Sequence, residues 1–331
     1  MAVKVGVIGV GLAGTAHVNT LNRWVAGADV VAVADIALER AREVAALCPG
    51  DVAPFADPIE LIDSVDVEAV VITSIARTHA ELVLACISRG KPVFCEKPLA
   101  VTAEECRTIV DAEIASGKHL VQVGFMRRFD PSYLALKEAT ADGQIGDVVA
   151  IHAAHRNASV PGSFTSEMHV TEALIHEIDV HRWLLEDEYV DVQVDATATD
   201  GQLLDPQHVR FRTAAGRHID VEVFVNAGYG YDIRCEVVGR KGTASLAGAH
   251  APVVNSAGAS RVGHHADFRT RFAEAYRDEL VVWIDGIARG EVDGPNSWDG
   301  YVAAVVSDAA IAALHSGEVE PVSLPAKPDF Y

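Results

Sequence analysis

The chain has 331 residues, half of them hydrophobic, which is long for a single core and suits two domains. Its 27 basic and 47 acidic residues give a formal net charge of −20, and no basic cluster offsets it, which argues against nucleic acid as a partner. No apolar run is long enough to cross a bilayer and no charged-then-apolar leader precedes the first strand, so we expect a soluble cytoplasmic protein.

The first predicted strand, Ala2–Val10, is a nearly continuous β-branched run, as in a central parallel strand buried on both faces. It leads into a G-x-G-x-x-G loop that opens a predicted helix. In such a loop the first glycine permits a tight turn, the second lets the backbone approach a pyrophosphate, and the third allows close strand–helix packing. Amides at the helix N-terminus then face the anion. We predict dinucleotide binding by this loop, which consists of Gly9, Val10, Gly11, Leu12, Ala13 and Gly14.

The second predicted strand, Val30–Ala34, ends in Asp35, 21 residues after Gly14. A carboxylate at this place can accept a hydrogen bond from the adenosine ribose 2′-hydroxyl and would repel a 2′-phosphate. Ile36 follows where an NADP-binding chain would more often carry arginine. We therefore predict NAD as the cofactor, with Asp35 and Ile36 among its contacts.

Helices and strands continue to alternate as far as residue 124. This pattern predicts an α/β fold with a doubly wound parallel sheet of the Rossmann type over residues 1–123. The remaining predicted elements of this half are helices at Ala37–Leu47, Thr78–Arg89 and Thr102–Ser116, and strands at Ala69–Thr73, Pro92–Cys95 and Leu120–Gly124.

Ser74 and His79 flank the loop after the strand at Ala69–Thr73, where a side chain can touch the cofactor. A second interpretation is that Thr78 caps the following helix and His79 lies in its first turn. The sequence leaves both open.

Lys91–Ala100 places an acid, a lysine and a proline where a parallel strand should end, at the edge where ligands bind. Lys97 precedes Pro98, which biases its backbone away from helix and permits a cis bond. Glu96 and Lys97 are therefore candidates for cofactor and substrate contacts. The alternative is a solvated loop lysine.

After Gly124 the pattern changes to successive strands joined by short turns such as Ala214–Arg217, which indicates antiparallel pairing and a separate domain over residues 124–331. The closing helices could pack back on the first domain. The predicted elements are a helix at Pro131–Ala141, strands at Val148–His155, Val190–Ala198, His208–Arg212, Ile219–Asn226 and Ile233–Val238, and closing helices at Phe268–Arg289 and Trp298–His315.

The predicted helix Met168–Leu185 carries Glu172 and His176 four residues apart, within side-chain reach, and Asp179 three residues further on. An imidazole exchanges protons near neutral pH, and a neighbouring carboxylate can orient it and raise its basicity. A solvated helix face would show such pairs too, but the flanking residues are too apolar for full exposure.

Metal binding is not expected. The five cysteines show no C-x-x-C spacing, which favours reduced thiols. His176 and His181 are five residues apart and do not form H-E-x-x-H. His264 and His265 lie in a Gly-flanked loop without an acid or histidine at ligand spacing.

Three segments together resemble the Gfo/Idh/MocA oxidoreductases, and within them the inositol 2-dehydrogenases. They are Ala16–Leu21 after the glycine-rich loop, Glu96–Ala100, and the closing Lys327–Tyr331. The resemblance spans the whole chain. It implies a Rossmann domain followed by an α/β domain with an open, mostly antiparallel sheet, and assembly as a homotetramer.

The resemblance also implies a catalytic set of lysine, aspartate and histidine. Lys97 and His176 match it, and Glu172 stands where the family has aspartate. One extra methylene moves a carboxylate by about 1 Å, an error that can matter to rate. Further substrate contacts implied by the family are Met126, Arg127, His155, Asn157 and Tyr231, although each could be a structural polar group.

The predicted reaction is hydride transfer from a secondary hydroxyl of a cyclitol to NAD, with myo-inositol giving 2-keto-myo-inositol (scyllo-inosose) in inositol catabolism. His176 would accept the hydroxyl proton and Lys97 would stabilise the oxygen, although Lys97 could itself be the base. The alternatives are another polyol, such as scyllo-inositol or glucose, and a non-catalytic NAD-binding redox sensor.

Overall fold

The computed structural model describes residues 2–198, 203–246 and 253–331. The chain divides into two compact units, each made of segments that are not contiguous in sequence. Unit 1 comprises Met1–Met126, Glu274–Ala304 and Pro325–Tyr331, and unit 2 comprises Arg127–Ala273 and Val305–Leu324. The first division lies three residues from the predicted boundary, but two late segments return to unit 1.

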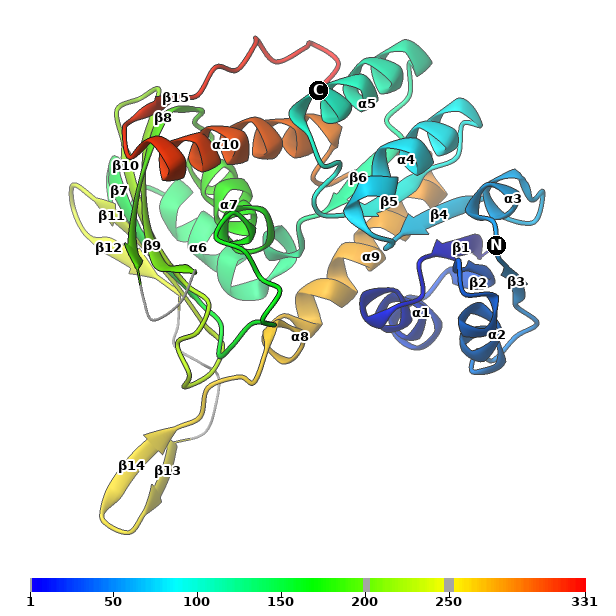
Figure 1. The fold of residues 1–331 in the computed structure, drawn as a ribbon, viewed down its shortest axis with the longest axis horizontal. Coiled ribbons are helices and arrows are strands. Elements are labelled where there is room, and N and C mark those ends of the chain that lie inside the picture. Colours follow the sequence, from blue (N-terminus) through cyan, green and yellow to red (C-terminus); the bar gives the residue numbers. More distant parts are fainter. Residues whose placement is uncertain (1, 199–202, 247–252) are drawn as a thin grey trace. The chain divides into compact units, whose positions relative to one another are not determined.

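Unit 1 contains a six-stranded parallel sheet in the order β3-β2-β1-β4-β5-β6 (Figure 1). This is the strand order of a doubly wound dinucleotide-binding sheet. The chain adds β2 and β3 on one side of β1 and β4, β5 and β6 on the other, so the strand order reverses between β1 and β4. The fold class predicted for the first half is confirmed. The strands are β1 (Val3–Ile8), β2 (Ala28–Ala34), β3 (Ala53–Phe55), β4 (Ala69–Ile72), β5 (Val93–Glu96) and β6 (Val121–Gly124).

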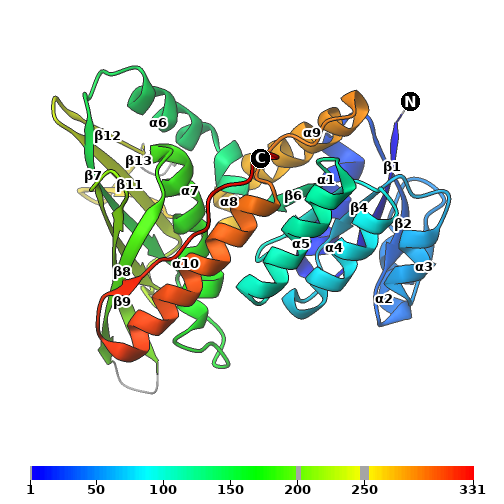
Figure 2. The ribbon, with the colours of Figure 1, turned by 90° about the horizontal axis from the view of Figure 1, so that it is seen from above.

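Helices cover both faces of this sheet, with α4 and α5 on one face and α1 and α9 on the other (Figure 2). Although α9 is distant in sequence, its Leu280, Trp283 and Ile284 are buried in one cluster with β1, β2 and α1. The helical elements of unit 1 are α1 (Leu12–Trp24), α2 (Leu38–Ala46), α3 (Pro58–Asp63), η1 (Ala76–Thr78), α4 (His79–Ser88), α5 (Ala103–Ser116) and most of α9 (Ala273–Arg289).

The last residue of the chain is anchored in unit 1. The Tyr331 hydroxyl donates to Glu113 Oε2 at 2.8 Å and lies 2.6 Å from Ser297 Oγ. The other oxygen of Glu113 accepts from the backbone amides of Leu120 and Val121 at 2.7 and 2.8 Å. The buried Glu113 thus ties α5, the start of β6, α10 (Ser297–Ser316) and the C-terminus together.

Unit 2 contains a seven-stranded mixed sheet in the order β12-β11-β7-β10-β9-β8-β15. Among the described strands of this sheet only β10 and β7 pair in parallel, so the predicted open and mostly antiparallel sheet is confirmed. The strands are β7 (Val148–Arg156), β8 (Tyr189–Ala198), β9 (Leu204–Thr213), β10 (His218–Phe224), β11 (Asp232–Gly239), β12 (Thr243–Ser245) and β15 (Glu320–Pro321).

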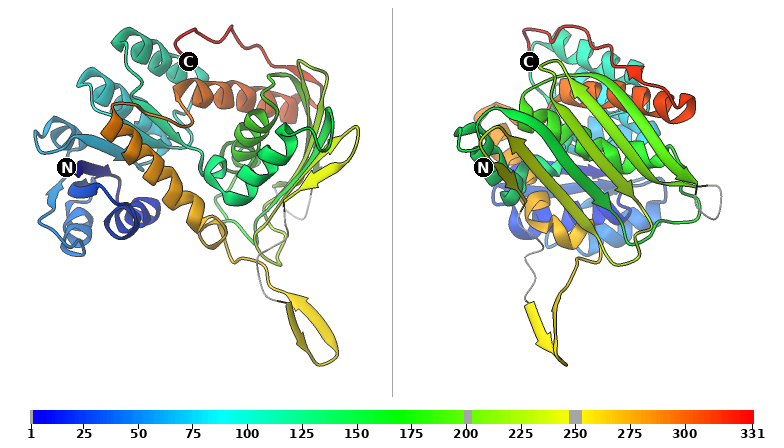
Figure 3. Two further views of the ribbon diagram at one scale, coloured as in Figure 1. Left: turned by 180° about the vertical axis from the view of Figure 1, so that it is seen from behind. Right: turned by 90° about the vertical axis from the view of Figure 1, so that its left-hand side faces the viewer.

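One face of this sheet carries α6 and α7, while the strands on the opposite face are seen without a covering helix (Figure 3, right). A separate exposed hairpin pairs β13 with β14. The remaining elements of this part are η2 (Met126–Phe129), α6 (Pro131–Ala141), η3 (His169–Leu174), α7 (Ile175–Leu185), β13 (Val253–Ser256), β14 (Ala259–Val262) and α8 (Phe268–Arg271).

Two predicted helices differ from the structure. The segment predicted as one helix at Phe268–Arg289 is interrupted at Phe272, whose side chain is fully buried, and forms α8 and α9. The helix predicted from Met168 begins as the π-helical turn η3 before continuing as α7. None of the described helices is long and apolar enough to span a membrane.

Candidate active site

The glycine-rich loop joins β1 to α1, and its three glycines have different surroundings. Gly9 has a φ of +86°, and a methyl group on it would lie 2.5 Å from the Ser74 backbone. A methyl group on Gly14 would lie 2.0 Å from the Gly9 carbonyl oxygen, so this glycine is needed for strand–helix packing. A methyl group on Gly11 would meet nothing within 4 Å. The space beside Gly11 is open where a pyrophosphate would approach.

The N-terminus of α1 also fits an anion. No side chain caps it, and no acidic residue lies in its first turn. Its first backbone N–H groups therefore remain available to a phosphate. Leu12, the first helical residue, is 69% exposed, so it does not shield them from solvent.

Asp35 follows β2 beside this loop. Its carboxylate accepts from the Val10 amide at 3.1 Å and from the Ala37 amide at 2.9 Å. Each oxygen has a second lone pair for a ribose hydroxyl. The next residue, Ile36, is 91% exposed and offers an apolar surface beside the acid.

Arg40 is a residue of the loop region that sequence reasoning missed. Its Nε donates to the Val10 carbonyl at 3.0 Å, and a terminal nitrogen donates to Thr15 Oγ1 at 2.9 Å. It thus braces the loop from α2. Arg40 lies five residues after Asp35, and this spacing was the available signal in the sequence. The spacing alone does not distinguish an arginine that braces the loop from an arginine on the surface.

His79 is buried in the first turn of α4, as the second interpretation of the sequence held, but the Thr78 side chain makes no capping hydrogen bond and donates to the Ile75 carbonyl at 2.9 Å instead. Its ring nitrogens lie 2.7 Å from the Pro98 carbonyl oxygen and 3.0 Å from the Ser74 carbonyl oxygen. It therefore bridges the segments that follow β4 and β5. Ser74 Oγ lies 2.7 Å from the Thr78 hydroxyl, so these side chains pair within the loop.

Glu96 and Lys97 lie where β5 ends, and the Lys97–Pro98 peptide is cis. Glu96 Oε1 lies 2.7 Å from His17 Nε2 of α1, while Oε2 accepts from the Lys97 amide at 3.2 Å. Burial acts to raise the pKa of Glu96, but His17 and the Lys97 ammonium outweigh it and lower the pKa. Glu96 is thus held ionised directly before Lys97.

Glu172 and His176 belong to unit 2. Glu172 is exposed within η3, whereas His176 is buried in the first turn of α7. Single π turns occur frequently at functional sites. The Glu172 carboxylate and the His176 ring are therefore carried by successive, differently wound turns.

His155, at the end of β7, lies beside His176. Their rings are stacked with centroids 6.5 Å apart, and the Tyr231 ring meets His155 edge-on at 5.7 Å. Unit 2 therefore brings three of the predicted substrate residues together. Burial lowers the pKa of His155, which favours the neutral ring, and raises the pKa of Tyr231 to about 12.

A buried ion pair supports this group. The Arg127 guanidinium bonds to Glu177 and lies 3.0 Å from His155 Nδ1. Burial acts to raise the pKa of Glu177, but Arg127 and the hydrogen bond from His155 lower it to about 2. The described bonds of Arg127 go to protein groups, so it holds His155 and Glu177 in place. Glu177 was missed because its spacing looks like that of a solvated helix residue.

Met126 and Asn157 are placed differently. The Met126 side chain is buried. The side-chain oxygen of Asn157 is buried without a hydrogen-bond partner, just after the strand that carries His155. Such an acceptor suits a hydroxyl-rich ligand.

The other candidate residues of the second half make structural contacts. Asp179 pairs with Arg128 through both carboxylate oxygens. His181 contacts Glu177, and burial lowers the pKa of His181 to about 4. His265 contributes a backbone bridge to Tyr231, and the His264 ring meets the Tyr229 ring edge-on.

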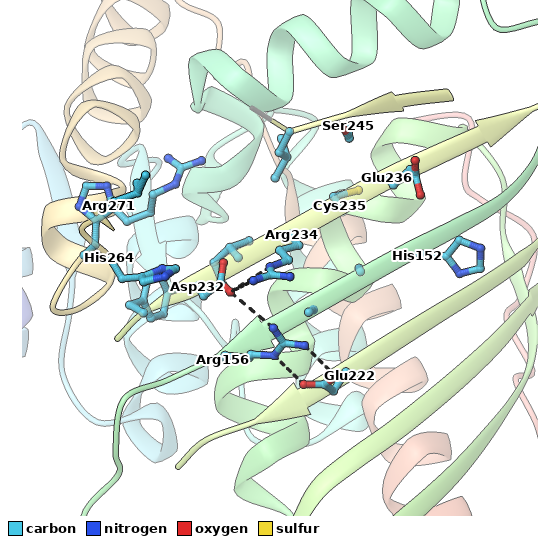
Figure 4. Close-up of a pocket in the computed structure, with 17 residues that line it drawn as sticks. His152, Arg156, Glu222, Asp232, Arg234, Cys235, Glu236, Ser245, His264 and Arg271 are labelled. Atoms are coloured by element: carbon cyan, nitrogen blue, oxygen red, sulfur yellow. Dashed lines mark hydrogen bonds and ion pairs between the residues drawn. The ribbon is translucent and has the colours of Figure 1, made fainter. Parts of the chain in front are cut away.

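The hollow drawn in Figure 4 lies on unit 2 and is a charged surface. Arg156 bonds to Glu222 through two nitrogens and pairs with Asp232, which also pairs with Arg234. Arg156 is adjacent to His155 in β7 and therefore points to the opposite face of the strand. None of the predicted catalytic residues lines this hollow.

Comparison with known proteins identifies the family. Residues 3–125 match the model of the oxidoreductase family with an NAD-binding Rossmann fold, and residues 133–245 match the Gfo/Idh/MocA C-terminal domain. The chain belongs to the Gfo/Idh/MocA oxidoreductase family. The resemblance seen in the glycine-rich loop and the E-K-P segment is thereby confirmed, as is the predicted NAD-binding domain.

Relatives in this family match from end to end. The chain is 52% identical to inositol 2-dehydrogenase 1 of Saccharopolyspora erythraea and 47% identical to the inositol 2-dehydrogenase of Burkholderia cenocepacia, covering 100% of this chain and 99% of each relative. The crystal structure of myo-inositol dehydrogenase from Lactobacillus casei, in complex with NAD(H) and myo-inositol, matches with a TM-score of 0.97. It is 37% identical, and the match covers 100% of both chains.

Proposed function

We propose that this oxidoreductase is an NAD-dependent inositol 2-dehydrogenase that oxidises a secondary hydroxyl of myo-inositol to give 2-keto-myo-inositol. The observation that carries the proposal is the similarity to inositol 2-dehydrogenases over the whole chain, at 52% identity with one of them. Substrate recognition does not transfer with the fold alone, so the residues of the site must support it as well.

The cofactor cradle supports the use of NAD. Gly9 and Gly14 allow the tight turn and the close strand–helix packing, Gly11 leaves open space beside the amides at the start of α1, and Asp35 supplies a carboxylate at the end of β2. A 2′-phosphate beside Asp35 would meet like charge. When bound, the oxidised nicotinamide accepts the hydride that leaves the substrate carbon.

The residues proposed for catalysis have distinct roles. His176 accepts the proton of the reacting hydroxyl, and Lys97 donates a hydrogen bond to the same oxygen and stabilises its developing negative charge. Glu172 orients the His176 ring or a neighbouring substrate hydroxyl. His155, Asn157 and Tyr231 supply further polar groups, and Arg127 fixes His155 from behind.

The decisive experiment measures NADH formation by the purified protein with NAD and myo-inositol, beside scyllo-inositol, glucose and an NADP control. We expect turnover with myo-inositol and NAD, and at least tenfold lower kcat/KM with NADP. Activity confined to another polyol would overturn the substrate assignment while keeping the enzyme class. NAD binding without turnover on any polyol would instead support a redox sensor.

The variant K97A, assayed in parallel, tests the role of the lysine. We expect its NAD affinity to stay within about threefold of the parent protein while its turnover falls at least 100-fold. Near-normal turnover in K97A would remove Lys97 from the mechanism. If K97A fails and an H176A variant keeps substantial activity, Lys97 is itself the base.

We further propose that the protein works in the cytoplasm as a homotetramer. The β13–β14 hairpin supports an oligomer because Val253, Val254 and Val262 are 60%, 52% and 48% exposed, and neighbouring copies would cover such side chains. Light scattering on the purified protein is expected to give four times the 35.2 kDa chain mass. A chain-mass particle at assay concentration would overturn the assembly.

A further inference from the structure

Glu279 is a carboxyl group that the mechanism above does not use. It lies on α9, its side chain is fully buried, and neither of its carboxylate oxygens has a hydrogen-bond partner. An ionised carboxylate in such surroundings is strongly disfavoured, so the group must be neutral or paired with something else.

The nearest acidic group is Glu96. A carboxylate oxygen of Glu279, one of Glu96 and a ring nitrogen of His17 all lie within 4.8 Å of one another. These residues come from α9, β5 and α1, all of which belong to unit 1. Glu279 is fully buried and Glu96 is partly buried, and two carboxylates this close in such surroundings do not both ionise, so one proton is held by the pair.

The surroundings decide which carboxyl holds the proton. Glu96 is bonded to His17 and to the Lys97 amide, and these partners lower its pKa. Burial and the negative charge of Glu96 raise the pKa of Glu279 well above its usual range. The titratable groups that interact with this pair are His17 from α1 and Cys95 and Lys97 from the β5 segment, and the Tyr276 ring on α9 contacts the His17 ring.

We propose that Glu279 is held as a neutral carboxylic acid whose proton faces the Glu96 carboxylate, and that it acts as a positioning residue for the segment carrying Lys97. A carboxylate with a neutral acid on one side and an imidazole on the other is kept ionised and fixed in place. Glu96 then holds the Lys97 amide in a constant orientation. This inference rests on the proposed catalytic role of Lys97.

The protonation state is tested without any assay of activity. Infrared difference spectra of the cofactor-free protein at pH 7, parent minus E279Q, should contain the carbonyl stretch of a protonated carboxylic acid. A difference spectrum with only carboxylate bands would overturn the proposal. So would one bound metal ion per chain that E279Q loses, because a cation would keep both carboxylates ionised.

The positioning role is tested by a pair of variants that differ only in polarity. E279L removes the neutral polar group that faces Glu96, so we expect kcat at pH 7 to fall at least tenfold and the acidic limb of its pH profile to rise by about one unit. E279Q keeps a neutral polar group at that place, so it should restore most of kcat and return the limb toward its original position.

Equal losses in E279L and E279Q with an unmoved pH limb would reduce Glu279 to a packing residue and overturn the positioning role. Failure of the proposed function can be told apart from failure of this inference. If Lys97 is not catalytic, K97A is active, while the infrared band of the protonated Glu279 is still present.

Discussion

At the scale of single residues, the main departure expected from the family pattern is Glu172. It stands where the family's aspartate is expected, but it is carried by the π turn η3 rather than by a regular α-helix. A π turn shifts the direction of its side chains relative to the turns that follow. The position of the Glu172 carboxylate therefore depends both on the extra methylene and on the winding of the π turn.

The variant E172D tests whether this site is fitted to glutamate. We expect kcat/KM for myo-inositol to fall about tenfold or more, because the shorter side chain withdraws the carboxylate by about 1 Å while the backbone conformation is unchanged. Steady-state NADH formation measures this change, and NAD affinity by titration should remain unchanged.

E172Q serves as the matched control, since it retains the length and loses the charge. If E172D is as active as the parent protein or more so, the site is built for the shorter acid and glutamate is only tolerated. Equal activity of E172Q and the parent protein would show that the charge has no role.

At the scale of elements, the glycines at the β1–α1 junction have two different roles, packing and ligand access. Gly14 is required for packing because a methyl group there would lie 2.0 Å from the Gly9 carbonyl and 2.5 Å from Thr73 Oγ1. Gly11 has open space beside it, and its φ of −68° with a ψ of −147° lies outside the regions that other residues commonly adopt. The same motif thus carries one structural and one ligand-facing position.

Alanine substitutions should separate these two uses. G14A is expected to lower the free energy of unfolding by about 2 kcal/mol or more, through overpacking against fixed backbone. G11A meets no neighbouring atom and is expected to cost only about 1 kcal/mol, through its backbone conformation, yet to bind NAD at least tenfold more weakly. Urea unfolding and NAD titration measure the two effects. Tight NAD binding by G11A would show that the pyrophosphate does not approach this glycine.

Much of the cofactor cradle could be predicted because each piece has a local signal. The strand, the glycine spacing and the ribose acid are contiguous or regularly spaced, so Gly9, Gly14 and Asp35 were found from sequence. Glu113 and Glu279 have no such signal, because their partners lie far away in the chain. An isolated acid in an amphipathic helix looks the same whether it faces solvent or a buried site.

The same limit applies to secondary structure. The five long strands of the second sheet alternate clearly and were predicted, while β3 and β12 have three residues each and β15 has two, too few to establish a period. The break at Phe272 was missed because the apolar residue fits a helical pattern and only tertiary packing shows its burial. The short helix α3 did have a signal, since Asp57 caps it and Pro58 occupies its first turn.

At the scale of the whole molecule, buried ionisable groups make stability depend on pH. His181 is fully buried beside Glu177 and has a pKa of about 4, against 6.5 when exposed. Glu177 has a pKa of about 2, against 4.5. In both cases the unfolded chain binds a proton at a higher pH than the folded chain does, so acid favours unfolding.

The two groups act in successive pH ranges. Between about pH 6.5 and pH 4 the unfolded chain protonates at His181 while the folded chain stays neutral there, and the free energy of unfolding falls by up to about 1.4 kcal/mol per pH unit. Between about pH 4.5 and pH 2 the same argument applies to Glu177. His155, whose pKa burial also lowers, adds to the loss in the first range.

The variant H181Q isolates one of these contributions. Pulsed hydrogen exchange, read on peptides of α7 along a urea series, gives the unfolding midpoint of this region at pH 7, 5.5 and 4.5. We expect the parent midpoint to fall steadily with pH and that of H181Q to fall less steeply, because the glutamine side chain does not titrate. Parallel slopes in the two proteins would mean that folded and unfolded chains protonate His181 alike. The burial of His181 against Glu177 would then fail to keep its ring neutral, and the acid sensitivity of unit 2 would have to come from its other groups.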